Sequence, residues 1–337
     1  MNKQKSFSVA LIAILSFYLA FPVPPAQALI SLTAPSAVLL EPVSERVLYS
    51  REPHSKRPPA STTKIVTALV LLDSLPLERW VVITPLATQV EASKLYFKSG
   101  DKVQVRDLLE AILMKSANDA AKAIAIEIGG TERHFAELMT QKAGSLGAQN
   151  TRFINSTGLP AEGQYTTAYD LALIMGEARK NKLIVSILKQ RTAVIRTYYG
   201  NQYHFKSHNK MLMRGERVIG KTGWTRHAKY CFVGLIESDS REAIVSVLGS
   251  RKLWIDLRNL RNQVTGKDDN ILSYGDRGED VQKLQAALKR SGFFKIHPTG
   301  YDGKITKLAV TRFQKSRGFP ADGIAGAHTR KALESNL

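Results

Sequence analysis

Residues 59–74 read PASTTKIVTALVLLDS and place a serine and a lysine at the start of an apolar helical pattern. The apolar positions recur at spacings of three and four, as on the buried face of a helix, and they are Ile65, Ala68, Leu69 and Leu72. The pattern predicts a helix that begins near Ser61, just after two prolines that a helix start tolerates. Positions i and i+3 share one face of a helix, so Lys64 can lie beside Ser61.

A serine and a lysine in this arrangement can act as a nucleophile and its base. A serine hydroxyl is a weak nucleophile that needs a base within hydrogen-bond reach. Burial and a neighbouring positive charge would lower the pKa of Lys64, so that its neutral amine can accept the proton. A helix start at Ser61 would also direct backbone N–H groups at a developing oxyanion. Alone, Ser-x-x-Lys is more typical of an N-cap serine followed by a solvated lysine.

Two further motifs carry related chemistry. Ser116-Ala117-Asn118 lies between helices predicted at 105–114 and 119–128, where it can relay a proton and hold a substrate amide; the alternative is a plain helix N-cap. Lys221-Thr222-Gly223 ends a strand predicted at 217–221. Its lysine and hydroxyl can clamp a terminal carboxylate, and its glycine lets a substrate lie close to the strand. The alternative is an exposed edge lysine before a turn.

The three motifs, in this order, resemble the signature of penicillin-binding proteins and class A β-lactamases. The stretches FINSTGL at 153–159 and TTAYDLA at 166–172 extend the likeness. Residues 31–255 therefore resemble the low-molecular-mass penicillin-binding proteins, the serine D-Ala-D-Ala carboxypeptidases of bacteria.

The resemblance implies a role for each motif residue. Ser61 would be the acylated nucleophile and Lys64 its base. Ser116 and Asn118 would be the proton relay and the substrate-orienting pair. In the third motif, Lys221 and Thr222 would bind the terminal carboxylate beside Gly223. The backbone N–H groups of Ser61 and Trp224 would form the oxyanion hole. β-Lactams would inhibit such an enzyme, and the family implies no cofactor.

The predicted elements indicate an α+β fold of the penicillin-binding-protein and β-lactamase type, an antiparallel sheet with helices. Strands are expected at both ends of the first domain and helices between them, which suggests a sheet that joins the two ends. The expected strands are 37–40, 46–49, 217–221, 230–237 and 242–249, with a turn at Asp239-Ser240. The remaining expected helices are 132–143, 168–179 and the closing 254–264.

The C-terminal part changes character. Residues 265–273 lack a hydrophobic period and are the expected linker. Residues 274–337 contain a repeat in which 299–306 is echoed by 322–329, each copy predicting a glycine turn that caps a short helix. This segment resembles the three-helix peptidoglycan-binding domain of many wall hydrolases, with Thr299 where aspartate is usual.

The N-terminus predicts export. Two lysines, Lys3 and Lys5, precede an apolar stretch at 7–21, three prolines and Ala26-Gln27-Ala28. This order is typical of a signal peptide, 1–28, cleaved after Ala28, and it leaves 29–264 as the catalytic domain; the alternative is an uncleaved anchor. The mature protein is expected in the periplasm or cell wall.

Composition narrows the partners. The formal net charge of +19 predicts an anionic partner. An exported chain without zinc-finger spacing or a basic-aromatic stripe is not expected to bind nucleic acid, so peptidoglycan is the expected partner, with only electrostatic or transient membrane contact. The seven histidines show no metal-ligand spacing, so no metal is expected. The single cysteine, Cys231, excludes an intrachain disulfide and is expected in the core.

Three competing functions and one departure from the family pattern remain open. A β-lactamase would need a carboxylate to activate water, and no Glu-x-x-x-Asn box lies at 155–180. A D,D-endopeptidase that cuts cross-links would use the same catalytic residues. A non-catalytic wall-binding scaffold would not need all three motifs. The departure is Lys229, where many relatives have glycine; we expect its charge beside the site, where it would alter substrate preference.

Overall fold

The computed structural model describes residues 30–238, 241–265, 272 and 274–335. The predicted signal peptide, the turn at Asp239-Ser240 and most of the predicted linker lie outside the described residues. Among the described residues, no helix is both long enough and apolar enough to span a membrane.

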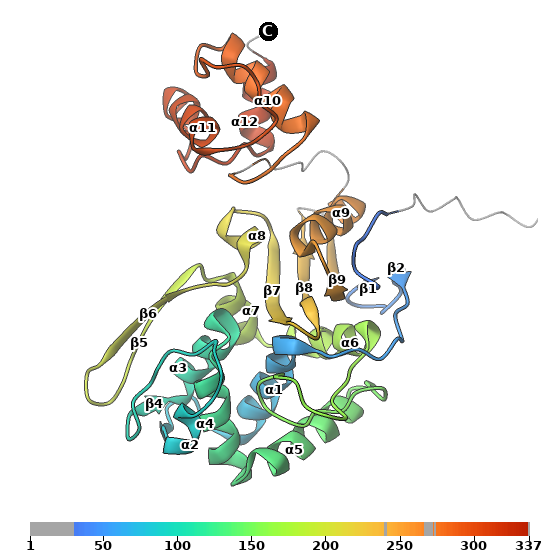
Figure 1. Cartoon of the computed structure of the whole chain (residues 1–337), viewed down its shortest axis with the longest axis vertical. Coiled ribbons are helices and arrows are strands. Elements are labelled where there is room, and N and C mark those ends of the chain that lie inside the picture. Colours follow the sequence, from blue (N-terminus) through green and yellow to red (C-terminus); the bar gives the residue numbers. More distant parts are fainter. Residues whose placement is uncertain (1–29, 239–240, 266–271, 273, 336–337) are drawn as a thin grey trace, which may run out of the picture. The chain divides into compact units, whose positions relative to one another are not determined.

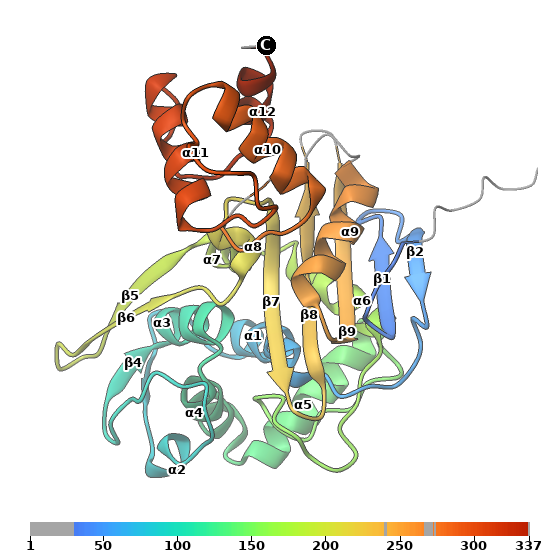
Figure 2. The same cartoon turned by 45° about the horizontal axis from the view of Figure 1, so that its top comes forward.

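A five-stranded antiparallel sheet joins the two ends of the first domain, as the sequence predicts. The strand order is β2-β1-β9-β8-β7 (Figures 1 and 2). The strands are β1 (Ser36–Leu40), β2 (Val47–Arg51), β7 (Val218–Thr225), β8 (Lys229–Glu237) and β9 (Glu242–Ser250). The early strand β1 pairs with the late strand β9 over its whole length, which closes the domain.

Helices cover both faces of this sheet. In Figure 2, α9 (Leu253–Thr265) lies in front of β8 and β9, whereas α1 (Lys64–Ser74) and α6 (Ala168–Ala178) lie behind the sheet. A strand covered on both sides reads as a continuous apolar run rather than an alternation. This accounts for the unbroken burial of 231–236 in β8, and it places Cys231 in the core.

The helical region beside the sheet carries the second motif. It contains α3 (Val105–Glu110), a π-helix (Ala111–Lys115), α4 (Asn118–Gly129) and α5 (Glu132–Ser145). The helix predicted at 105–114 is thus two helical forms in succession. The π-helix ends at Ser116, whose φ of 61° is left-handed, so the chain turns sharply before α4 begins.

Several short elements were not predicted, because three to five residues are too few to show a period. They are α2 (Pro85–Thr88), β3 (Trp80–Val82), β4 (Lys102–Gln104), β5 (Thr192–Arg196), β6 (Gln202–Lys206) and α8 (Lys210–Met213). The longer α7 (Lys182–Lys189) was also missed. β3 pairs with β4, and β5 pairs with β6, in two separate two-stranded sheets.

The C-terminal residues form three helices with a core of their own: α10 (Glu279–Arg290), α11 (Lys304–Ser316) and α12 (Ala327–Glu334). The sequence repeat corresponds to two equivalent glutamines. Gln285 bonds Thr299 and Thr306 around one glycine turn, and Gln314 bonds Asp322 and Thr329 around the other. The Thr299 hydroxyl accepts the hydrogen bond that the Asp322 carboxylate accepts in the second copy, which explains why threonine is tolerated there.

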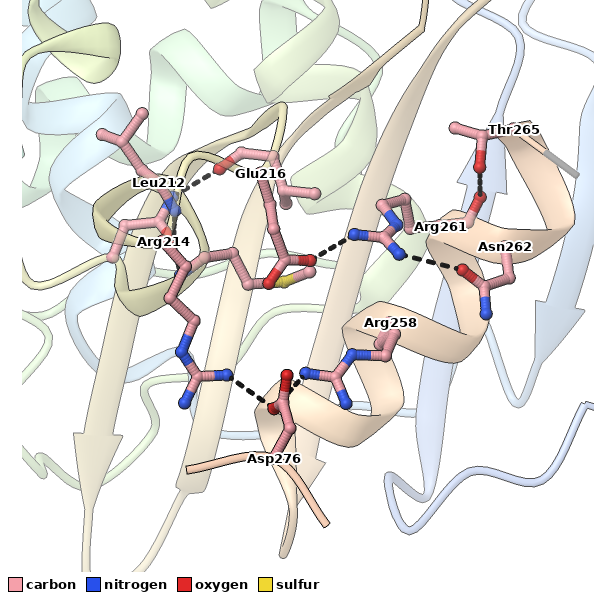
Figure 3. A network of polar contacts seen from close by, with 11 residues as sticks. Leu212, Arg214, Glu216, Arg258, Arg261, Asn262, Thr265 and Asp276 are labelled. Carbon is pink, nitrogen blue, oxygen red and sulfur yellow. Dashed lines mark hydrogen bonds and ion pairs between the residues drawn. The ribbon is translucent and has the colours of Figure 1, made fainter. Parts of the chain in front are cut away.

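A charged network surrounds Glu216 and Asp276 (Figure 3). Glu216 is buried and paired with Arg261 of α9. Asp276 accepts hydrogen bonds from Arg214 at 3.2 Å and from Arg258 at 2.7 Å. Because the Asp276 side chain is 4% exposed, these pairs are less screened by solvent than surface ion pairs.

Candidate active site

Ser61 lies in a tight turn between the prolines and α1. The structure corrects the predicted helix start: residues Ala60–Thr63 form a 3₁₀ helix, and the α-helix begins only at Lys64. Neighbouring glycines leave room for this turn. A Cβ on Gly158 would lie 1.8 Å from the Ala60 carbonyl oxygen, and a Cβ on Gly223 would lie 2.7 Å from the Ser61 nitrogen. Both positions therefore require glycine for close packing against the nucleophile turn.

Lys64 lies beside Ser61 as the spacing predicts, and it is fully buried. Its Nζ is 3.2 Å from Ser61 Oγ, 2.6 Å from Asn118 Oδ1 and 2.7 Å from the Thr157 carbonyl oxygen. The two carbonyl oxygens can only accept hydrogen bonds, whereas the serine hydroxyl can donate one. A neutral Lys64 amine donates to both carbonyl oxygens, and its lone pair is then left for the proton of Ser61.

The charge state of Lys64 follows from its surroundings. Burial, followed by the nearby positive charge of Lys221, lowers its pKa well below the usual value. The carboxylates of Asp119 and Glu132 act in the opposite direction and raise the pKa, but less strongly. A lysine in such a position can hold a neutral amine in the pH range in which an ordinary lysine is charged.

Asn118 and Ser116 line the same cleft as Ser61. The Asn118 amide group is fixed at both ends, because its Oδ1 accepts from Lys64 and its Nδ2 donates to the Glu91 carbonyl at 2.8 Å. The Asn118 backbone N–H donates to the Ser93 carbonyl at 2.7 Å, and Ser93 Oγ donates to the Lys115 carbonyl at 3.0 Å. The loop at 91–97 and the Ser-x-Asn turn therefore hold each other in place, with Ser116 buried at the cleft.

The third motif lies within β7 rather than at the end of a short strand. Lys221 is buried, its Nζ donates to the Thr222 carbonyl at 2.7 Å, and burial lowers its pKa to about 7. Thr222, Gly223 and Trp224 follow along the strand and line the cleft beside Ser61. The tertiary structure thus brings all eight predicted site residues to one place, although Lys64 and Lys221 lie beneath its surface.

The cleft has a volume of about 540 Å³. Its lining includes residues that the motifs did not indicate: Lys94, Tyr96, Lys115, His208, Lys210, Tyr230 and Trp254. No short motif contains these lining residues, because they come from separate loops and from the ends of helices and strands. In the sequence, only Lys115 could have been noticed, because it directly precedes Ser116. The prediction that the charge of Lys229 lies beside the site is wrong. Lys229 is exposed and is not among the lining residues, whereas its neighbour Tyr230 is among them. Lys229 begins β8 with a left-handed φ of 58°, so its backbone departs from the extended strand that follows.

A larger depression of about 820 Å³ lies elsewhere, along α5 and residues 151–154. Its lining contains no serine or cysteine nucleophile, so we assign the chemistry to the cleft at Ser61. Within the described ranges, no group of three His, Cys, Asp or Glu side chains is placed to hold a metal ion.

Comparison with known families agrees with this geometry. A family described as D-alanyl-D-alanine carboxypeptidase matches residues 23–252, which include all three motifs. The chain belongs to the D-alanyl-D-alanine carboxypeptidase family. A second family, described as a peptidoglycan binding domain, matches residues 277–333 of this carboxypeptidase-family chain.

Individual relatives point the same way. D-alanyl-D-alanine carboxypeptidase DacF of Bacillus subtilis is 33% identical over 223 residues, 64% of this chain and 57% of that protein. D-alanyl-D-alanine endopeptidase of Escherichia coli is 30% identical and matches 69% of this chain and 77% of its own length. The crystal structure of a D-alanyl-D-alanine carboxypeptidase from Mycobacterium tuberculosis superposes with a TM-score of 0.65 at 30% identity, covering 69% of this chain and 91% of that one.

The match thus spans just over half of the Bacillus relative. The family acts on the cell wall. Membership of this family implies that the chain acts outside the cytoplasm.

Proposed function

We propose that this protein is a serine D-Ala-D-Ala carboxypeptidase that removes the terminal D-Ala from peptidoglycan stem peptides through an acyl-enzyme on Ser61. The observation that carries the proposal is the Lys64 amine, which is buried, low in pKa and 3.2 Å from Ser61 Oγ. The other two neighbours of the amine, Asn118 Oδ1 and the Thr157 carbonyl oxygen, are hydrogen-bond acceptors. The lone pair of the neutral amine is therefore left to accept the proton of Ser61.

Acylation would begin with the attack of Ser61 Oγ on the carbonyl carbon of the penultimate D-Ala. The serine proton passes to Lys64 Nζ, and the carbonyl oxygen becomes an oxyanion held by the N–H groups of Ser61 and Trp224. Lys64 returns this proton through Ser116 to the leaving D-Ala nitrogen, the C–N bond breaks, and Lys64 is neutral again. Lys221 and Thr222 hold the terminal carboxylate during this step, and Asn118 orients the amide.

Deacylation would reverse the roles. Water enters the site of the departed D-Ala, loses a proton to the neutral lysine and attacks the ester carbonyl. The ester C–O bond breaks, Ser61 Oγ recovers its proton, and the shortened peptide leaves. A β-lactam presents a similar amide, but its leaving nitrogen stays tethered to the acyl group, so we expect a long-lived adduct.

A D,D-endopeptidase is the second candidate, because two relatives carry that name. The same residues would cleave a cross-link whose leaving group is a longer peptide. A β-lactamase and a non-catalytic scaffold have less support, because the first lacks an assigned water-activating carboxylate and the second would not need the Lys64 arrangement.

Two experiments test the proposal. Intact-mass analysis with a labelled penicillin should show one adduct on the full mature chain and none on Ser61→Ala. Mass spectrometry of digested muropeptides should then show the loss of one D-Ala from pentapeptides. Conversion of dimers to monomers would favour the endopeptidase, and an adduct that survives Ser61→Ala would overturn the nucleophile.

We also infer how the enzyme reaches its substrate. The N-terminal pattern supports export with cleavage after Ala28, and residues 274–337 would bind peptidoglycan and keep the enzyme at the wall. The net charge of +19 suits an anionic wall polymer and allows transient contact with an anionic membrane.

A further inference from the structure

The charges that line the catalytic cleft are all of one sign. Among the described lining residues are three lysines, Lys94, Lys115 and Lys210, but no aspartate or glutamate. Burial, followed by the nearby lysines, lowers the pKa of His208 to about 4, so it adds no charge at neutral pH. Clefts with walls of one sign concentrate the electric field and favour ligands of opposite charge. The lining therefore favours a substrate that carries negative charge.

The two carboxylates that act on Lys64 are engaged elsewhere. The Asp119 carboxylate is buried and accepts the backbone N–H groups of 95–97. Glu132 accepts from Ser156 and pairs with Lys122 at 3.6 Å. Within the described chain, Lys115 and Lys210 have no ion pair, although surface lysines such as Lys142 and Lys180 do.

The lysines stand on both walls of the cleft. Lys115 precedes Ser116, and Lys94 belongs to the loop that holds Asn118. Lys210 is the first residue of α8, on the β7 side. The preceding Asn209 fixes this helix, because its side chain donates to the Val218 carbonyl of β7 at 2.7 Å and accepts from the first N–H groups of α8. Lys210 is thus an exposed cation on a rigid support.

The terminal carboxylate of the substrate does not account for these charges. Under the proposed function, Lys221 and Thr222 already bind it. The leaving group of a carboxypeptidase is a single D-Ala, which has no second carboxylate. Any further negative charge that meets Lys210 and Lys115 must therefore belong to the residues that precede the scissile bond.

We propose that the cleft selects stem peptides with a free carboxylate on the acyl side of the scissile bond, and that Lys210 is the residue that chiefly determines this preference. The inference rests on the proposed function and adds the charge of the preferred substrate to it. Amidation of that carboxylate would make the same peptide a poorer substrate.

A matched pair of peptides tests the proposal on the full mature chain. Acetyl-L-Glu-D-Ala-D-Ala and acetyl-L-Gln-D-Ala-D-Ala have nearly the same shape and differ by one charge. We expect kcat/KM to favour the Glu peptide by up to about fivefold at low salt, and the preference to shrink as salt screens the charges. Lys210→Met should lower the ratio of the two kcat/KM values toward one, and Lys210→Glu should invert it.

Lys206→Met is the matched control. Lys206 is an exposed lysine four residues earlier, outside the cleft lining, so the ratio should stay as in the parent enzyme. Equal kcat/KM values for both peptides in the parent enzyme, or a Lys210→Met enzyme with an unchanged ratio, would overturn the inference alone. Failure to hydrolyse either peptide, together with failure to react with penicillin at Ser61, would overturn the proposed function instead.

Discussion

At the scale of single residues, Lys64 combines complete burial with three polar neighbours. Replacing it by methionine keeps much of its volume but removes the amine, so Ser61 loses its base. We expect Lys64→Met to slow penicillin acylation by a factor on the order of 100 to 10,000. Stopped-flow acylation at neutral pH measures this loss.

Stability distinguishes a lost base from a lost fold. Lys64→Met leaves the acceptors Asn118 Oδ1 and the Thr157 carbonyl without their donor, which costs about 1–3 kcal/mol each when such groups are buried. The removal of a buried amine offsets part of this cost. Thermal unfolding should therefore still be cooperative. A folded Lys64→Met protein that acylates at the parent rate would exclude Lys64 as the base.

Lys221 makes the enzyme pH-dependent in a predictable direction. Its pKa of about 7 in the free protein means that it loses its charge as the pH rises through that value. In the proposed role of Lys221, substrate capture needs the charged form, so kcat/KM should fall above about pH 7. On the acidic side, kcat/KM should fall where Lys64 becomes protonated, because a charged amine cannot accept the serine proton.

The comparison of kcat with kcat/KM identifies the group. A bound carboxylate stabilises the charged form of Lys221 and raises its pKa in the complex. The alkaline fall should therefore be shifted to higher pH in the kcat profile. An alkaline fall at the same pH in both profiles would show that a different group is responsible.

At the scale of elements, one carboxylate positions a loop that lines the active site. Asp119, at the start of α4, accepts from the backbone N–H groups of Leu95, Tyr96 and Phe97. The same loop receives the N–H of Asn118 at Ser93. We expect Asp119→Asn to destabilise the fold by about 2 kcal/mol. The amide of asparagine has a single acceptor oxygen, and its NH₂ group would face the backbone N–H groups of the loop, which are also donors.

The catalytic consequence should accompany this loss of stability. A shifted Asn118 would misplace the substrate amide, so acylation should slow by a factor on the order of 10 to 100. Denaturant unfolding and acylation kinetics measure the two effects. Asp73→Asn, at an exposed carboxylate on α1, is the control. Normal acylation by a destabilised Asp119→Asn enzyme would show that the loop does not control the position of Asn118.

At the scale of the whole molecule, we predict that residues 274–337 bind the wall without taking part in the chemistry. A chain cut after Val264 should react with penicillin as the full chain does but should lose sedimentation with purified sacculi. Its activity on sacculi should fall more than its activity on a small peptide, because the module raises the local enzyme concentration. Equal sedimentation of both chains would assign the module another role.

The charged network around Asp276 makes a further control necessary for the truncation experiment. Truncation removes Asp276 and leaves Arg214 and Arg258 without their shared carboxylate. A loss of stability could then be mistaken for a loss of wall binding. Asp276→Asn in the full chain removes the two ion pairs but keeps the module, so it should sediment with sacculi as the parent does.

The predictability of the fold differed between elements. The helices α1, α4, α5 and α6 were predictable because each buries one face, which imposes a helical period on the sequence. The strands of the sheet were predictable as short apolar or alternating runs bounded by turn residues. The short strands β3 to β6 and the helix α8 were not, because three to five residues show no period. The 3₁₀ turn at Ser61 was missed because the helical pattern runs through it unchanged.

The sequence by itself determined the three motifs that supply the residues of the proposed site and their order along the chain, because Ser61 and Lys64 are local neighbours on one helical turn and each motif is a short, contiguous stretch. Only the tertiary structure decided which further residues share the cleft. It placed Lys210 and Tyr230 in the lining and left Lys229 outside, since the direction of a side chain depends on strand pairing and loop packing. The lowered pKa values of Lys64 and Lys221 also follow from that packing, because burial comes from elements that are distant in the chain.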